Sequence, residues 1–301
     1  MEVQLEPGKY VVAVSGGVDS VSLLRLLYDL RQSIGPNRLD FVVAHYEHGI
    51  RSDSYLDTIF VEGLAKQYNF AFVSAAGNLG KSTSEAKARE YRYAFLREVN
   101  TSSRAQAIIT AHHQDDVIET AIVNILRGTA RKGVTALQNH ADIYRPLLAY
   151  SKDEVKAYAQ LHHLTWREDS TNADDKYLRN YIRHKIMTRF SANDRRAFVA
   201  TINKMRDINE QIDQILDNEL HIQSVGGMID RQWFIQLPHI VARETMATWL
   251  RSQGERNFDK KMLERLVVAG KAARAGSVHS VSRFTQLNVE RNFLALKAFE
   301  R

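Results

Sequence analysis

The sequence predicts an α/β protein: an open, mostly parallel five-stranded sheet with helices on both faces, followed by a small helical α+β domain. The main observation is that short, apolar, β-branched runs alternate with stretches of helical spacing as far as His163. A glycine-rich turn also follows the first apolar run directly, as in many ligand-binding sheets. From Lys176 onward the pattern changes to helices, which indicates a second architecture in the rest of the chain.

The predicted strands are short apolar runs bounded by polar or glycine-containing segments. They cover Val11–Val14, Phe41–His45, Phe70–Ser74, Ala107–Ala111 and Ile143–Leu148. Helical spacing predicts the intervening helices at Ser20–Leu30, about Ser54–Tyr68, about Ser84–Val99, the second part of His112–Gly128, and Lys152–His163. The polar stretches Ser15–Ser20, His45–Arg51 and His112–Glu119 all follow strands, so we expect them together at one edge of the sheet.

The remainder of the chain is predicted to be mainly helical. The predicted helices are Tyr177–Phe190, a long one from Asp194 to about Leu220, Asp230–Gln253 and Asp259–Val268, with a break at Gly226–Gly227. Three apolar runs at Val278–Val281, Thr285–Glu290 and Phe293–Leu296 predict a small terminal sheet. We therefore expect a first domain over residues 1–215 and a small second domain over residues 216–301.

The composition excludes several classes of protein. Hydrophobic residues make up 44% and charged residues 25% of the 301 residues, as in ordinary soluble domains. Because no apolar run approaches the roughly 20 residues of a membrane span and the N-terminus has no signal pattern, we expect a cytoplasmic protein without a membrane partner. Cysteine is absent, which excludes disulfides, thiolate nucleophiles and cysteine-ligated metal or iron–sulfur sites.

The positive charge of the chain lies in its second half. Residues 1–150 hold 16 basic and 16 acidic side chains, whereas residues 151–301 hold 25 basic and 19 acidic ones, which accounts for the net charge of +6. A neutral half followed by a basic half predicts a polyanionic partner such as a nucleic acid. A basic but otherwise ordinary surface is the alternative.

The turn SGGVDS at Ser15–Ser20 is the first candidate site. Gly16 and Gly17 allow a sharp turn, and the following helix start offers free N–H groups and the positive end of its dipole to an anion. The turn lacks the lysine of the common P-loop and the third glycine of the dinucleotide fingerprint. It resembles instead the SGGxDS motif of the PP-loop ATP pyrophosphatases. That resemblance implies ATP cleaved between its first and second phosphates, with Mg²⁺ held by Asp19.

The stretch HHQDDVIET places acids at the start of a predicted helix. Asp116 and Glu119 are three positions apart, and Asp115 and Glu119 four, so carboxylates can share one helix face. Acids at a helix start also complement its dipole, which explains at least one of them without a catalytic role. A metal site formed with the pair His45 and His48 is a further alternative.

Arginines at helical spacing form further candidate sites. Arg89 and Arg92 lie three positions apart in EAKAREYRYAFL, and Arg179 and Arg183 lie four apart in RNYIRH. Their planar donor groups suit phosphates. Solvated or salt-bridged surface arginines are the alternative.

Taken together, the motifs resemble those of tRNA(Ile)-lysidine synthases. SGGVDS, AHYEHGIR, EAKAREYRY, TAHHQDDVIET, LRGTARKG, RPLL, WREDSTN and RNYIRH occur in the order of that family, closely over residues 10–190 and more weakly over residues 220–301. The resemblance implies that ATP adenylates the oxygen on carbon 2 of the wobble cytidine of a CAU-anticodon isoleucine tRNA. The amino group of free L-lysine then displaces AMP. The chain is short for the family, which often carries a further C-terminal domain.

The resemblance also implies roles for individual residues. ATP and pyrophosphate would be bound by Ser15, Gly16, Gly17, Val18, Asp19, Ser20 and His45. The catalytic set would be Asp19 with its Mg²⁺, Arg92 at the reacting centre, Asp116 and Glu119 for lysine, and Arg183 for ATP or tRNA. Arg89, Arg179 and Arg183 would contact the tRNA. The resemblance allows a homodimer.

Other functions compatible with the motifs remain open. An amidating synthetase of the NAD, GMP or asparagine type shares the PP-loop, although this chain lacks a glutaminase cysteine. A tRNA thiolase is disfavoured by the absence of cysteine. From another class, a nucleotide-binding protein that interacts with tRNA without turnover would keep the loop and not release pyrophosphate.

Overall fold

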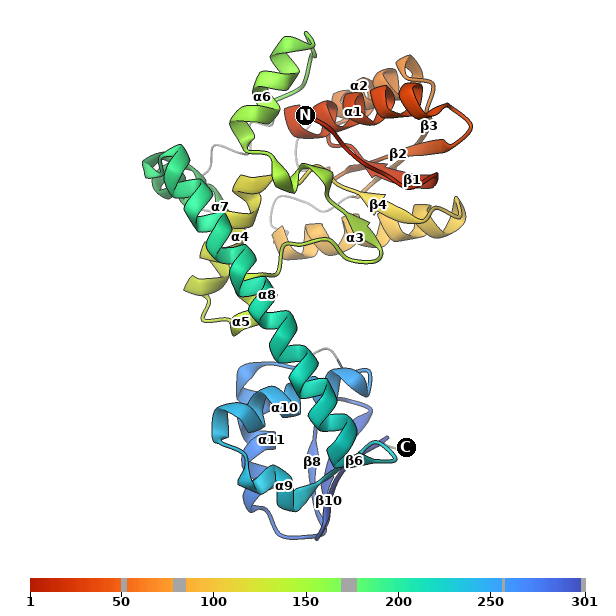
Figure 1. Cartoon of the computed structure of the whole chain (residues 1–301). Coiled ribbons are helices and arrows are strands. Elements are labelled where there is room, and N and C mark those ends of the chain that lie inside the picture. The colour runs from red at the N-terminus through yellow and green to blue at the C-terminus, as the bar shows by residue number, and fades with distance from the viewer. Residues whose placement is uncertain (50–52, 78–84, 169–177, 256–257, 299–301) are drawn as a thin grey trace. The chain divides into compact units, whose positions relative to one another are not determined.

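The computed structural model describes residues 1–49, 53–77, 85–168, 178–255 and 258–298 (Figure 1). The chain divides into two compact units, residues 1–205 and residues 206–301. The division falls inside the long helix α8 (Ala192–Gln223). The functional division at residues 215 and 216 stays a prediction.

Unit 1 is built on a parallel sheet, as predicted. Within the described residues the sheet has five strands in the order β3-β2-β1-β4-β5. These are β1 (Gly8–Ala13), β2 (Leu39–Glu47), β3 (Ala71–Ala76), β4 (Ala107–Ile109) and β5 (Ile143–Tyr144). Val11, in the central strand, lies opposite Val42 on one side and Ile108 on the other. The inner strands β1, β2 and β4 contain runs of consecutive buried apolar residues because both faces of the sheet are covered there, whereas the edge strand β3 is mostly exposed.

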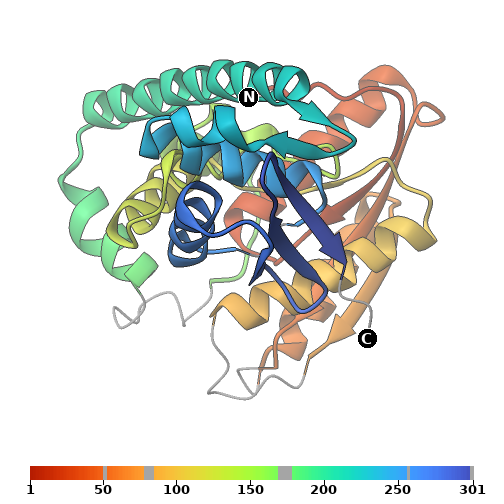
Figure 2. The ribbon, with the colours of Figure 1, turned by 90° about the horizontal axis from the view of Figure 1, so that it is seen from below.

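Helices cover the two faces, and the alternation of side chains along β1 shows how. Val12 and Val14 pack with α1 (Val18–Ile34), α2 (Tyr55–Gln67) and α6 (Lys152–Leu161). Val11 points to the opposite face and packs with α3 (Glu85–Ser102). Figure 1 shows α1 and α2 on one side of the strands and α3 on the other, and in Figure 2 α3 lies in front of the sheet. The predicted helices on both faces are confirmed.

The strand order creates a switch point beside β1. The chain runs outward from β1 through β2 to β3 and then returns to add β4 on the other side of β1. The loops after β1 and β4 therefore leave the sheet in opposite directions and open a crevice between them. Ser15–Ser20 and the start of α4 (Gln114–Leu126) both lie at this point. The sequence prediction that the polar stretches meet at one edge is confirmed for these two and for residues 45–49 of the third, which line the same cavity; Ile50 and Arg51 lie outside the described residues.

Two predicted elements of unit 1 are corrected by the structure. The fifth strand was expected to reach Leu148, but it ends at Tyr144 and is followed by a 3₁₀ turn, η1 (Pro146–Ala149), because Pro146 cannot donate to a strand neighbour. The helix expected at Tyr177–Phe190 is instead a succession of α7 (Leu178–Tyr181), a π-turn η3 (Ile182–Ile186) and a 3₁₀ turn η4 (Met187–Arg189). Tyr177 lies outside the described residues. A short helix, α5 (Arg131–Val134), was not predicted.

In the described residues, unit 2 packs three helices, together with the C-terminal part of α8, on an antiparallel sheet. Its helices are α9 (Arg231–Gln236), α10 (His239–Ser252) and α11 (Lys260–Ala272). Its strands, within the described residues, are β6 (Ser224–Val225), β7 (Met228–Asp230), β8 (Ser277–Ser280), β9 (Thr285–Val289) and β10 (Phe293–Ala298), in the order β6-β7-β10-β9-β8. Buried Phe234, Trp249 and Leu294 form part of its core.

The structure also corrects two predictions in unit 2. The helix expected at Asp230–Gln253 is interrupted at Leu237 and Pro238, since proline does not continue a helix, and Pro238 caps α10 instead. Gly226 and Gly227 do more than break the chain: their φ angles of +59° and +79° form the tight turn that pairs β6 with β7. Among the described residues, no helix is long and apolar enough to cross a bilayer.

Candidate active site

The turn after β1 is held in shape by the hydroxyl of Ser20. Its Oγ accepts hydrogen bonds from the backbone N–H groups of Ser15 and Gly16, both at 3.2 Å, and donates one to the carbonyl oxygen of Gly17 at 2.9 Å. Ser20 is buried, so these contacts are shielded from water. The loop is thus fixed by a residue of its own motif.

The same turn leaves the start of α1 open to an anion. Gly17 is the N-cap residue and offers no side chain to the first N–H groups of the helix, and Gly16 has a φ of +93°, which a residue with a side chain rarely adopts. Val18 and Asp19 begin the helix. The exposed N–H groups and the helix dipole therefore form an anion-binding site where the resemblance expects pyrophosphate.

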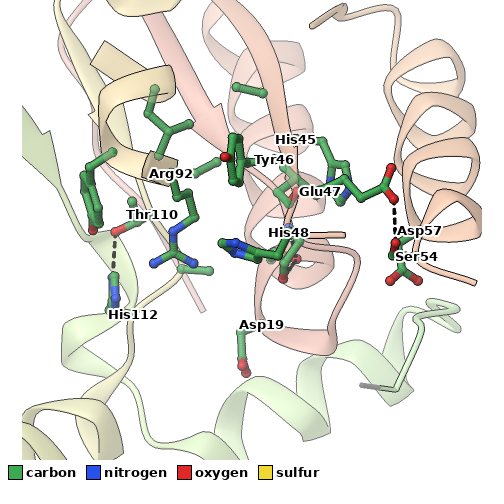
Figure 3. Close-up of a pocket in the computed structure, with 18 of the residues that line it drawn as sticks. Asp19, His45, Tyr46, Glu47, His48, Ser54, Asp57, Arg92, Thr110 and His112 are labelled. Atoms are coloured by element: carbon green, nitrogen blue, oxygen red, sulfur yellow. Dashed lines mark hydrogen bonds between the residues drawn. The ribbon is translucent and has the colours of Figure 1, made fainter. Parts of the chain in front are cut away.

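A cavity of about 320 Å³, here called the strand-edge cavity, lies beside this turn at the ends of β1, β2 and β4 (Figure 3). His45 lies at its wall with Nδ1 2.8 Å from the carbonyl oxygen of Val14, while its Nε2 has no partner among the described residues. Burial lowers the pKa of His45, so the ring is neutral at pH 7 and Nε2 can accept a hydrogen bond. The Arg92 side chain lies toward His112 and His48 in the same cavity.

Another cavity, of about 730 Å³, opens on the other side of the turn and is here called the acid cavity. Its walls include Asp116 and Glu119 from α4, Lys152 from α6 and Arg183 from the π-turn. Ser15 and Asp19 line both this cavity and the strand-edge cavity. A molecule bound across the turn could therefore contact both sets of residues.

Asp19 stands where the cavities meet. Lys152 Nζ lies 2.6 Å from both of its carboxylate oxygens, and His113 Nε2 lies 3.7 Å from one of them. Mg²⁺ in phosphate-handling sites is usually held by one or two carboxylates together with phosphate oxygens and water. An accessible carboxylate beside an anion-binding turn fits that donor set. No cluster of three or more His, Asp or Glu ligands occurs among the described residues, so the alternative of a His–carboxylate metal site gains no support.

Asp116 is a partly buried anion that several neighbouring groups stabilise. The backbone N–H of His113 donates to its Oδ2 at 3.0 Å, and His113 Nε2 lies 3.5 Å from the same oxygen. Burial alone would raise the pKa of Asp116, but its histidine neighbours, the backbone hydrogen bond and Arg179 outweigh burial and lower the pKa to about 2. Asp116 therefore stays ionised at any physiological pH.

Glu119, one turn further along α4, has a different environment. Arg183 donates to its two oxygens at 2.7 and 2.8 Å, and Arg179 Nε lies 3.3 Å from one of them. Burial nevertheless dominates and raises the pKa of Glu119. The predicted pair of acids is thus brought together, with one member firmly ionised and the other closer to accepting a proton.

Asp115 has a structural role instead. Its carboxylate accepts a hydrogen bond from the backbone N–H of Lys152 at 3.1 Å and pairs with Arg195 of α8. These contacts connect α4 with α6 and α8.

The predicted arginines lie around the same region. Arg92 lines the strand-edge cavity, and Arg183 lines the acid cavity. Arg89 and Arg179 line another cavity, of about 720 Å³, that lies next to these two. The structure therefore gathers all the predicted site residues on one side of unit 1, where they lie in or beside three adjacent cavities.

Several residues of the site were missed by the sequence analysis. Lys152 follows a serine that caps α6, a pattern that predicts a helix start and gives no hint of its pairing with Asp19. The backbone N–H of Arg167 donates to the carbonyl oxygen of Gly16 at 3.0 Å, and its side chain pairs with Asp57. Arg167 belongs to the WREDSTN motif, of which residues 169–172 lie outside the described part of the chain.

Sequence comparison finds curated relatives of this chain. A tRNA(Ile)-lysidine synthase of Lactiplantibacillus plantarum is 31% identical over 281 residues, covering 88% of this chain and 61% of that protein. One of Thermus thermophilus is 41% identical over 180 residues, covering 58% of this chain and 34% of that protein. The chain spans about half the length of the curated relatives it matches.

A solved structure supports the fold at a greater distance. The U34-tRNA thiolase NcsA from Methanococcus maripaludis superimposes with a TM-score of 0.54 at 14% identity, over 67% of this chain and 73% of that one. A family model described as the PP-loop domain matches residues 2–190, the part of the chain that contains both the anion-binding turn and the paired acids. The chain belongs to the PP-loop domain family.

Proposed function

We propose that this protein ligates free L-lysine to carbon 2 of the wobble cytidine of a CAU-anticodon isoleucine tRNA, and converts ATP to AMP and pyrophosphate. The observation that carries the proposal is the similarity to curated tRNA(Ile)-lysidine synthases, which in one case extends over 88% of this chain. A phosphate-binding turn that adjoins a cavity lined by carboxylates suits this reaction, because it needs both ATP and a cationic amino acid.

A PP-loop domain implies ATP binding. We assign the phosphates to the N–H groups of Ser15–Ser20 and the adenosine to the strand-edge cavity, where neutral His45 offers Nε2 as an acceptor. Mg²⁺ at Asp19 would offset the phosphate charge, and Lys152 would then release Asp19. Arg92 would stabilise the charge on the phosphate under attack by the cytidine oxygen. That step joins the oxygen to the first phosphate of ATP and releases pyrophosphate.

In the second step the amino group of lysine attacks carbon 2, AMP leaves with the cytidine oxygen, and the attacking nitrogen loses a proton. Only about one lysine side chain in 2,500 is neutral at pH 7, so the site has to accept a proton. Permanently ionised Asp116 suits binding of the ammonium group, whereas Glu119, whose pKa is raised by burial, suits proton transfer. Arg183 would orient Glu119 through its paired hydrogen bonds.

We assign the tRNA to the arginines beside these cavities and to the basic second half of the chain. Arg89, Arg179 and Arg183 would contact the anticodon region. Residues 1–215 would form the adenylation domain, and residues 216–301 a small substrate domain. Discrimination from the methionine tRNA with the same anticodon has to use features beyond the anticodon, and the tRNA stems offer them.

The proposal is tested by incorporation of labelled lysine into a CAU-anticodon isoleucine transcript with ATP and Mg²⁺, beside the methionine transcript. Incorporation into the isoleucine transcript alone is the expected result. Pyrophosphate release that depends on the transcript, without lysine incorporation, would keep adenylation and contradict lysine as the nucleophile. Absence of both signals with intact ATP binding would favour a binding protein without turnover.

A further inference from the structure

The cavity of about 720 Å³ next to the strand-edge cavity is rich in arginine. Within the described part of the chain its walls include Arg89 and Arg97 from α3, Arg127 at the end of α4, Arg145 before η1 and Arg179 from α7, and include no Asp or Glu. We call it the arginine cavity. Such a concentration of positive charge on the walls of one cavity favours an anion inside it.

Arg145 is the buried member of this group. It is 4% exposed and donates through Nη1 to the carbonyl oxygen of Gln138, but its Nε has no hydrogen-bond partner among the described residues. A buried guanidinium group without a carboxylate partner is costly, and burial accordingly lowers the pKa of Arg145. A bound anion would remove that cost.

Nearby carboxylates neutralise the charges of the other arginines only in part. Arg97 lies 3.5 Å from Asp142, and Arg179 lies 3.3 Å from Glu119. Arg89 and Arg127 have no carboxylate within salt-bridge distance among the described residues. Arg89 lies over the ring of Tyr93 at 4.7 Å, and Arg127 follows the last turn of α4, where a cation complements the helix dipole. These contacts explain the positions of the two side chains and leave their charge available.

The position of the arginine cavity narrows the choice of anion. Tyr93 and His112 line both this cavity and the strand-edge cavity, so the two lie side by side. A volume of about 720 Å³ exceeds what a single inorganic phosphate needs, and guanidinium groups that arise from separate elements suit a chain of phosphates and sugars. A chain bound there would continue toward the reacting centre.

We propose that the arginine cavity binds the RNA backbone phosphate next to the nucleotide that reacts with the ATP bound in the strand-edge cavity. This inference rests on the proposed function, since it takes the substrate to be RNA, and it adds a specific place where the backbone is held. Arg145 forms the floor of the phosphate site, and Arg89 and Arg127 form its accessible walls. Backbone contacts of this kind position the nucleotide without reading its base.

The test uses Arg89→Gln and Arg127→Gln, with Arg38→Gln as the matched control. Arg38 is an exposed arginine directly before β2, at the opposite end of the strands from the site. Binding of the labelled isoleucine transcript is measured against salt concentration without ATP or lysine, and thermal melting confirms that each variant is folded. Each cavity variant should bind about tenfold more weakly at low salt, and its slope of log affinity against log salt should be shallower by about 0.7. Arg38→Gln should match the unchanged protein.

The outcomes separate the inference from the proposed function. Cavity variants that bind RNA with the unchanged affinity and slope would overturn the inference even if the unchanged protein incorporates lysine. Weaker binding of inorganic pyrophosphate, with unchanged RNA binding, would also overturn it and assign the cavity to a free anion. If the RNA effect is present while no lysine is incorporated, the phosphate site stands and the proposed reaction fails.

Discussion

The anion-binding turn and the acid pair of α4 differ in how they are stabilised: the turn by contacts within its own motif, and the acid pair by contacts from distant parts of the chain. The turn is fixed by Ser20, which contacts residues at most five positions away. Glu119 is held by Arg183, 64 positions further along the chain, and by Arg179 from the same helical segment. One half of the site is therefore a local structure, and the other depends on the packing of distant elements.

This difference matters for function. A loop that carries its own hydrogen bonds keeps its shape whatever the rest of the site does, which suits the binding of ATP phosphates. The charge environment of an acid whose partners lie on another segment can change when that segment moves. This suits a group that has to take up a proton. Variants of the two regions should therefore fail in different ways.

The largest effect is expected at Asp19, which belongs to the local turn but is paired with distant Lys152. Asp19→Asn removes the carboxylate proposed to hold Mg²⁺, and should lower tRNA-dependent pyrophosphate release by about 10²–10³-fold. Folding should change little, since the pair of Asp19 and Lys152 is partly exposed. Asp153→Asn, an exposed acid of the same charge at the rim of the acid cavity, is the control and should keep its turnover.

Removal of a distant partner should instead destabilise the protein. Arg183→Gln leaves Glu119, whose side chain is 2% exposed, with Arg179 as its remaining partner, and should lower the free energy of unfolding by about 2–3 kcal/mol. The matched control is Arg25→Gln, which breaks the more exposed pair with Asp29 inside α1 and should cost less than about 1 kcal/mol. Urea titrations measure both. Equal losses in the two variants would mean that the packing around Glu119 adds nothing to its ion pair.

The same difference decides what could be predicted from the sequence. The turn and the helix start at Ser15–Ser20 were predictable because the hydrogen bonds of Ser20 that shape them lie within one motif. The start of α4 was predictable because its acids and its N-terminal position are both local. The pairing of Asp19 with Lys152 was not, since 133 positions separate them and neither residue type specifies the other.

Most of the incorrect secondary-structure predictions have local causes in the sequence. Pro146 and Pro238 end a strand and a helix that apolar spacing alone would continue. Gly226–Gly227 is a tight turn between strands too short to show a pattern. The π-turn at Ile182–Ile186 has no sequence signal that we can identify, although it carries Arg183 to the acid cavity.

A smaller effect should distinguish two serines of α1. Ser20→Ala removes the acceptor of two backbone N–H groups in the turn, and should cost about 1–3 kcal/mol of stability and weaken ATP binding. Ser22 is fully buried, and its hydroxyl has no partner among the described residues, so Ser22→Ala should be neutral or stabilising. Thermal melts with and without ATP measure both. A Ser20→Ala protein that binds ATP normally would show that the turn does not depend on this hydroxyl.

The smallest expected effect is a difference in pH dependence within the acid pair. Asp116 has a pKa of about 2, below its ordinary 3.8, so it contributes stability above pH 4 that is lost as pH falls from about 4 to 2, at most about 2 kcal/mol. Glu119 has a raised pKa, so its contribution has the opposite sign and is lost as pH rises through that pKa. Asp116→Asn should therefore flatten the acid limb of the stability curve, and Glu119→Gln should steepen it. Urea titrations between pH 3 and 7 measure both, and parallel curves for the two variants would mean that the acids share one environment.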